Sequence, residues 1–184
     1  MGERRDGAVG GMLRRVEVLT RRVALLGIAA LFVAIAITIV DVLLRAVAGF
    51  GILGTIDMIQ LCTMVAVFAA IPYAFAMQEH VGVDFVLHRM PPRLAAFFQG
   101  VGMLAAVAMM LGIGWYGWLR MMQQGEFGDS SQTIGIPIAF YWVPLLVAAV
   151  LSVLATAMLA VAYFARAAGA AVALPAREDV TAYE

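Results

Sequence analysis

Residues 23–40 read VALLGIAALFVAIAITIV, a run in which Thr38 is the one polar side chain. An α-helix needs about 20 apolar residues to cross about 30 Å of hydrocarbon, so this run is close to membrane length by itself. The apolar core of a cleaved signal peptide is shorter, about 7–15 residues. Asp41 and Arg45 also separate the run from the small residues at 46–48, which resemble a cleavage site. We therefore expect an uncleaved first membrane helix.

Three further apolar runs follow, and together they predict membrane helices over residues 23–47, 56–77, 94–119 and 136–164. The 184-residue chain is 64% hydrophobic and 13% charged, and its mean hydropathy is +0.97. So little polar surface excludes a soluble enzyme and a nucleic-acid-binding protein. No alternating strand pattern is present, which excludes a membrane barrel. The sequence predicts an all-α membrane protein, with four transmembrane helices packed as a bundle.

The charged residues indicate how the helices are oriented. The net charge is zero, and all 12 basic residues are arginines. Arg120 lies on one side of the predicted membrane, and Arg45 lies near that end of the first helix. The other ten fall on the opposite side: Arg4, Arg5, Arg14, Arg15, Arg21, Arg22, Arg89, Arg93, Arg166 and Arg177. By the positive-inside rule, both termini are expected to be cytoplasmic.

The residues before and after the membrane domain (23–164) form two further regions. We expect residues 165–184 to be a flexible cytoplasmic tail. Residues 1–22 form a basic arm that predicts a short amphipathic helix suited to anionic lipid. Its arginines (Arg14, Arg15, Arg21 and Arg22) share a third of the helix circumference, opposite Met12, Leu13, Val16, Leu19 and Val23, with Val18 on the wrong face. A simple positive-inside anchor and a docking arm for another subunit remain alternatives.

Polar residues gather near the outer ends of the first two helices. Asp41 and Arg45 are four residues apart, a spacing that allows a pair on one helix face. Asp57 can join them across the turn at 49–54, and Gln60 lies one turn further along. One interpretation is a charge-compensated helix end. The other is a polar contact with a partner protein or an ion path.

Aromatic residues mark the same side of the membrane. Trp115, Tyr116 and Trp118 end the third helix, and Tyr141 and Trp142 begin the fourth. We expect all five at the outer membrane–water boundary, where amphipathic rings concentrate. The alternative is that they pack between the helices.

Catalytic and metal-binding signals are weak. Glu79, His80 and Asp84 share an inner loop, but their spacing is not a zinc pattern. The two histidines, His80 and His88, lie across the membrane from the serines of the outer loop, so no Ser/His/Asp triad forms. Cys62 is the only cysteine, and no phosphate-binding glycine loop occurs. We expect no enzyme activity, no metal and no cofactor.

Three stretches together resemble the small permease subunit, the DctQ-like family, of tripartite ATP-independent periplasmic (TRAP) transporters. They are Asp41–Arg45 before a glycine-rich turn, Asp57 through the Glu-His-Val-x-Val-Asp stretch at 79–84, and Gly135-Ile136-Pro137 followed by Tyr141, Trp142 and Pro144. The likeness spans about residues 12–165. The chain departs from many relatives at Gln78, where a basic residue is common, and at Asp57, where a pair of acids is common.

The resemblance implies a function. A periplasmic solute-binding protein captures a small organic anion, a carboxylate, and delivers it to a large permease subunit that carries the substrate and sodium sites and moves as an elevator. The small subunit enlarges the static scaffold in the bacterial inner membrane. Expected partners are therefore the large subunit, the binding protein and membrane lipid, without nucleic acid. Candidate partner contacts or structural residues are Asp41, Arg45, Asp57, Gln60, Glu79, His80, Asp84 and Pro137.

The competing interpretation is a self-contained four-helix, proton-coupled exporter that acts as a homodimer. Such an exporter needs a buried acidic residue within a membrane helix. Asp41 and Asp57 lie near helix ends, which favours the scaffold interpretation.

Overall fold

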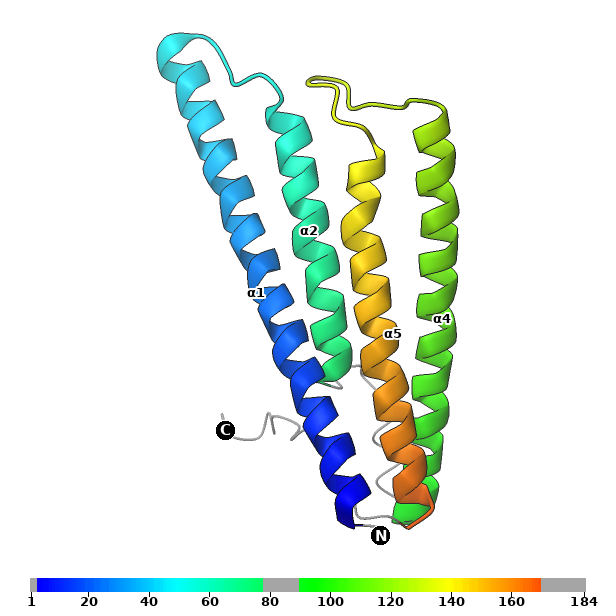
Figure 1. Cartoon of the computed structure of the whole chain (residues 1–184). Helices are drawn as coiled ribbons and strands as arrows, with labels where there is room; N and C mark the ends of the chain where they lie inside the picture. Colours follow the sequence, from blue (N-terminus) through cyan, green and yellow to red (C-terminus); the bar gives the residue numbers. More distant parts are fainter. Residues whose placement is uncertain (1–2, 78–89, 170–184) are drawn as a thin grey trace.

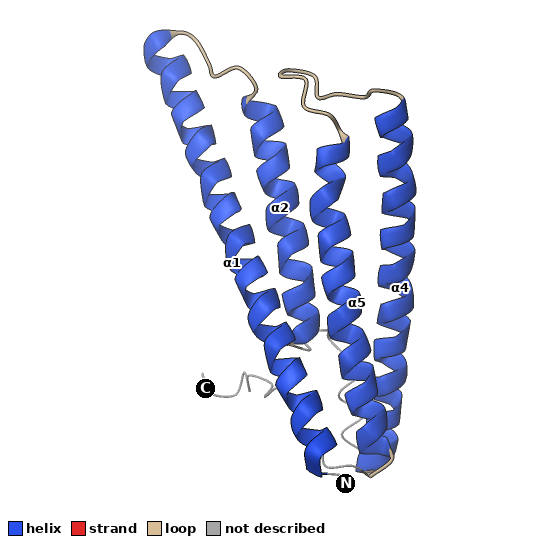
Figure 2. Ribbon diagram, viewed as in Figure 1, coloured by secondary structure: helices blue, strands red, loops and turns tan. Residues whose placement is uncertain are grey.

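A computed structural model describes residues 3–77 and 90–169, and it places four α-helices in this part of the chain (Figure 1). They are α1 (Glu3–Ala48), α2 (Thr55–Ala76), α4 (Pro92–Glu126) and α5 (Ala139–Ala167). All four are long and apolar enough to cross a membrane. The described residues contain no strand, only an isolated bridge between Ser130 and Pro137 (Figure 2). The predicted all-α class and the four membrane-length helices are confirmed.

The basic arm does not form a separate helix. The arm and the first predicted span are one helix, α1, of 46 residues. The sequence has no proline before Pro72 that would break it. At 1.5 Å per residue α1 is about 70 Å long, well beyond the thickness of the hydrocarbon layer. The arm therefore continues the axis of the first span.

The helices form an open row in the order α1, α2, α5, α4 (Figure 1). Among the described residues, α4 packs along α5, α5 packs along α2, and α2 packs along α1. In its most apolar 18-residue window, 44% of α5 is buried, against 17% for α2 and α4 and 11% for α1. α5 is therefore the central helix, and both broad faces of the row carry exposed apolar side chains.

One narrow stripe of α1 faces its neighbours. Its fully buried members recur every seven residues: Leu13, Thr20, Gly27, Ala34 and Asp41. A seven-residue repeat is the spacing of a left-handed helix–helix seam. The Thr20 hydroxyl lies 2.9 Å from the Val16 carbonyl and 3.0 Å from the Glu17 carbonyl, so its helix satisfies it.

The two ends of the row are held differently. We call the end with residues 49–54 and 127–138 the loop end (top of Figure 1) and the opposite end the terminal end. At the terminal end, α1 meets α5 directly, where Leu13 packs with Leu159, Ala162 and Tyr163. The apolar face predicted for the arm is thus partly buried: Leu13 is buried, and Val16 and Val23 are half-buried, but Met12 and Leu19 are exposed.

Glycines allow close approach along the row. A Cβ on Gly27 would lie 2.8 Å from the Ala69 Cβ and 3.1 Å from the Ala66 carbonyl oxygen on α2. A Cβ on Gly102 of α4 would meet nothing within 4 Å. The two glycines therefore differ in packing although both lie within membrane-length helices.

We expect Gly27→Leu to force α1 away from α2 and to destabilise the isolated chain in detergent by about 1–3 kcal/mol, the usual cost of overpacking. Thermal unfolding followed by circular dichroism measures the effect. Gly102→Leu is the matched control, because its new side chain points into open space. Equal melting temperatures for the two variants would contradict the packing described for α1 and α2.

Candidate functional site

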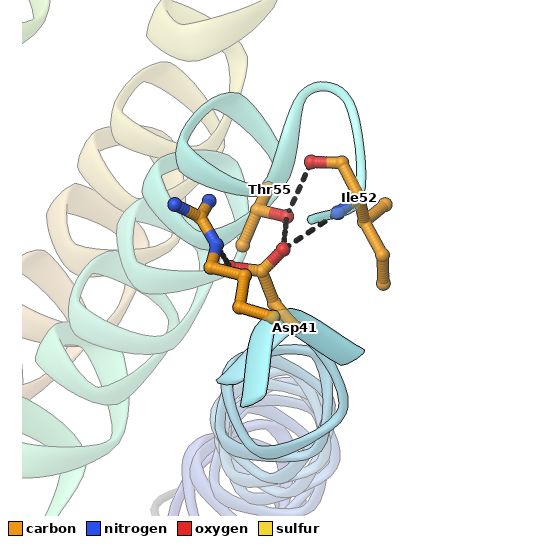
Figure 3. Close-up of polar contacts among 4 residues, drawn as sticks. Asp41, Ile52 and Thr55 are labelled. Carbon is orange, nitrogen blue, oxygen red and sulfur yellow. Dashed lines mark hydrogen bonds and ion pairs between the residues drawn. The ribbon is translucent and has the colours of Figure 1, made fainter. Parts of the chain in front are cut away.

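Asp41 organises the turn between α1 and α2. Its Oδ1 accepts a hydrogen bond from the Ile52 N–H at 2.7 Å and lies 3.0 Å from the Thr55 hydroxyl, which also lies 2.9 Å from the Ile52 carbonyl oxygen. Figure 3 shows the backbone nitrogen of Ile52 and the Thr55 hydroxyl directed at this carboxylate. Oδ2 accepts from the Arg45 Nε–H at 2.8 Å. The predicted Asp41–Arg45 pair is therefore present, and the same carboxylate also fixes the backbone of the turn.

Asp57 organises the other loop. It lies in the first turn of α2 and is only 3% exposed. Its Oδ2 accepts hydrogen bonds from the Ser131 hydroxyl at 2.7 Å and from the N–H groups of Thr133 and Ile134 at 3.2 and 3.0 Å. The expectation that Asp57 joins Asp41 and Arg45 is wrong, because these three donors of the 127–138 loop take its carboxylate.

The 127–138 loop also has an internal hydrogen bond and a contact with the 49–54 turn. The Ser131 Oγ accepts a hydrogen bond from the Ile136 N–H at 2.9 Å. This hydroxyl therefore links Asp57 to the second half of the loop. Ile134 sits against Gly54, where a Cβ would approach its Cγ2 to 2.5 Å. Gly54 also has a φ of 83°, which favours glycine. The two loops therefore lock the α1–α2 hairpin to the α4–α5 hairpin.

The five aromatic residues do not form one belt. Trp115, Tyr116 and Trp118 are exposed on α4, as expected of rings at a membrane boundary. Tyr141 is buried, and its hydroxyl donates to the Asp57 carbonyl oxygen at 3.2 Å. The Trp142 Nε1–H donates to the Gln124 Oε1 between α5 and α4. These last two follow the alternative interpretation and pack between the helices.

A cavity of about 450 Å³ lies at the loop end, where α2, α5, the end of α4 and the 127–138 loop meet. We call it the loop-end cavity. Polar side chains line its upper part, and apolar side chains extend it along the helices. The lining comprises Ile56, Asp57, Gln60, Met64, Gln124, Ser130, Ser131, Gln132, Thr133, Ile138, Tyr141, Trp142 and Leu145.

The predicted site residues therefore fall into several places. Asp41 and Arg45 form an ion pair at the end of α1, next to the 49–54 turn. Asp57 and Gln60 border the loop-end cavity. Pro137 is exposed on the loop, opposite Ser130. The four arm arginines (Arg14, Arg15, Arg21 and Arg22) are exposed along α1. Glu79, His80 and Asp84 lie outside the described residues.

Sequence reasoning predicted Arg45 as a partner of Asp41, but it missed Ile52 and Thr55 as the other partners of Asp41 and all three partners of Asp57. Ser131, one of the three donors to Asp57, was not among the predicted site residues. The available signal was the run of hydroxyl and amide residues at 130–133, which follows a helix and offers several donors together. Within residues 3–77 and 90–169, no three His, Cys, Asp or Glu side chains converge to hold a metal ion.

We expect Ser131→Ala to loosen the 127–138 loop, because it removes a donor to Asp57 and leaves the Ile136 N–H unpaired. An unpaired buried group costs about 1–3 kcal/mol. Hydrogen–deuterium exchange of residues 131–136 should become at least about tenfold faster. Ser130→Ala, at the neighbouring exposed serine, should leave the exchange unchanged. Similar exchange in the two variants would contradict the contact.

At the turn between α1 and α2, we expect Asp41→Ala to lower the melting temperature more than Arg45→Ala does. The Arg45 side chain is 61% exposed and that of Asp41 is 8% exposed. Exposed ion pairs contribute about 0–1 kcal/mol, whereas a buried acceptor with several donors contributes more. Thermal unfolding of both variants in one detergent measures the difference, and a larger effect of Arg45→Ala would show that the ion pair holds the turn.

Residues 34–167 match the family described as tripartite ATP-independent periplasmic transporters, DctQ component. No curated protein and no solved structure matches the chain. The match covers most of the chain, including α2, α4, α5, both carboxylate clusters and the loop-end cavity. It confirms the resemblance carried by the sequence motifs, and the chain belongs to the DctQ family, the small transmembrane permease components of TRAP transporters.

Proposed function

We propose that this chain is the scaffold subunit of a sodium-coupled, binding-protein-dependent secondary transporter that imports a small organic anion, a carboxylate. The observation that carries the proposal is that the central part of each span has no acidic, basic or histidine side chain, since Asp41 and Asp57 lie near helix ends. Residues 23–40, 58–77, 94–119 and 139–165 contain no Asp, Glu, His, Lys or Arg. A protein that moves an ion or a proton by itself places such groups deep in the membrane. This chain lacks them.

The threonine hydroxyls along the helices, buried at Thr20 and Thr156 and exposed at Thr38 and Thr63, support a static role. Thr20, Thr38, Thr63 and Thr156 each place the hydroxyl within hydrogen-bonding distance of a carbonyl oxygen of their own helix. In the described part of the chain, Ser152 Oγ is the only fully buried side-chain polar atom without a partner. These hydroxyls therefore complete the helices and do not line a polar path.

The open row supports assembly with the large permease subunit. Its broad faces are apolar, and a groove of about 790 Å³ runs between α4 and α5. The groove is lined by Gly114, Trp115, Trp118, Met110, Leu111 and apolar residues of α5 between 146 and 154. We propose that the large subunit and lipid cover such faces, and that the elevator moves against the enlarged frame. The periplasmic solute-binding protein is the third partner.

Arginine placement supports a location in the bacterial inner membrane with both termini cytoplasmic. The exposed side chains of Arg14, Arg15 and Arg22 border a shallow groove on α1 with Gly11, Val18 and Leu19. We propose that these arginines contact anionic lipid headgroups. Because α1 is continuous, the arm passes through the headgroup layer along the axis of the first span.

Co-expression with the large permease gene tests the proposal. We expect the large subunit to copurify in mild detergent, and we expect transport of carboxylates into liposomes to need both membrane subunits, the binding protein and a sodium gradient. The control is a liposome containing this chain alone, which should carry nothing. Solute or proton movement by the isolated chain would overturn the proposal and favour the homodimeric exporter.

A further inference from the structure

The Asp57 carboxylate uses only one of its two oxygens. Oδ2 accepts three hydrogen bonds from the 127–138 loop, whereas Oδ1 accepts none from the described residues. Oδ1 is not fully buried, because Ser152 Oγ is the only fully buried unpaired side-chain polar atom in the described part of the chain. Asp57 borders the loop-end cavity. A carboxylate with spare acceptor capacity on Oδ1 therefore borders that cavity, and it belongs to a residue that is 3% exposed.

The described residues offer no cation to this carboxylate. Asp41 and Arg45 form the one ion pair between described side chains. The lining of the loop-end cavity contains no arginine, lysine or histidine. A buried carboxylate is expensive in a low-dielectric setting unless a cation or several hydrogen bonds compensate it. Asp57 is compensated on the loop side and open on the cavity side.

The rest of the lining suits a cation that carries several hydrogen-bond donors. Gln60 and Gln132 border the cavity, and their amides make no hydrogen bond to described residues, so their carbonyl oxygens are available as acceptors. The Trp142 ring adds an aromatic wall, a surface that attracts cations. A guanidinium group has five N–H donors in a planar fork, which matches several acceptors better than an ammonium does.

We infer that the loop-end cavity receives an arginine side chain of the large permease subunit, with its guanidinium on Asp57 Oδ1. This inference rests on the proposed function, since it needs that partner. At about 450 Å³, the cavity has room for one such side chain. The contact deepens the scaffold role, because it sets the register of the two subunits at the loop end.

A phospholipid fits this cavity less well. The ammonium of an ethanolamine headgroup is tied to a phosphate, and the cavity has no basic side chain to receive that phosphate. Asp57 is the charged residue of the lining, and its carboxylate repels a phosphate. An arginine side chain, in contrast, brings a positive charge without an attached phosphate.

The first test uses Asp57→Asn in the complex with the large subunit. An asparagine oxygen still accepts from Ser131, Thr133 and Ile134, while its NH₂ replaces the open oxygen and repels a guanidinium. We expect the affinity for the large subunit to fall at least about tenfold, as when one partner of a desolvated charge pair is removed. Asp129→Asn removes the same charge from an exposed position of the same loop and should leave the affinity unchanged. Melting of the isolated Asp57→Asn chain at the wild-type temperature shows that the fold is kept.

The second test identifies the occupant even if Asp57→Asn fails to fold. A photo-cross-linking amino acid in place of the exposed Gln60 should attach to the large subunit, at a segment that contains an arginine. Replacement of that arginine by glutamine should reproduce the loss seen with Asp57→Asn, and the double variant should be no weaker than either single variant. Adducts with phospholipid, or with a second copy of this chain, would overturn the inference.

The outcomes also separate this inference from the proposed function. If the wild-type chain recovers no large subunit, the proposed function fails and the inference fails with it. If wild type and Asp57→Asn recover the large subunit equally, the scaffold function stands and the cavity contact is wrong.

Discussion

The structure depends on the need to satisfy backbone N–H groups where the chain turns at the end of apolar helices. Where such an N–H group is partly buried, a side chain can act as its acceptor. Asp41 accepts from Ile52, and Asp57 accepts from Thr133 and Ile134. Each aspartate thus holds a loop that would otherwise be free to choose among conformations. The two hairpins of the row meet through these loops, since Ile134 also rests on Gly54.

Contacts at the two ends of the row and along α5 explain how the four helices keep the order α1, α2, α5, α4 without a closed core. α5 contacts both α2 and α4, and it also meets α1 at the terminal end through Leu13. The loop end is held by polar contacts and the terminal end by apolar ones. The faces between these ends carry exposed Leu, Ile, Val and Phe side chains. The helix–helix contacts therefore run within the row, and the proposed large subunit would cover the apolar faces that the row leaves exposed.

The features that follow from local spacing could be predicted from the sequence. Apolar length gave the four helices, and the four-residue spacing of Asp41 and Arg45 gave their ion pair. The partner of Asp57 could not be predicted, because Ser131 is 74 residues away and only the packing of α2 beside α5 brings the two together. The burial of Tyr141 follows from the same packing. The continuity of α1 was available from the absence of proline, but the change from apolar to basic residues at 21–22 indicated a boundary instead.

The two aspartates show why similar residues in a sequence have different consequences. Both lie near helix ends, both are buried, and both bind a loop. Asp41 receives its counter-charge from Arg45, one turn along the same helix, so its cluster is electrically complete within the chain. Asp57 receives only neutral donors among the described residues, and it borders a cavity whose other lining side chains are neutral. A subunit that acted alone would gain stability from a basic side chain in that cavity. The arginine proposed for that cavity would complete the Asp57 cluster as Arg45 completes the Asp41 cluster, but from a second subunit.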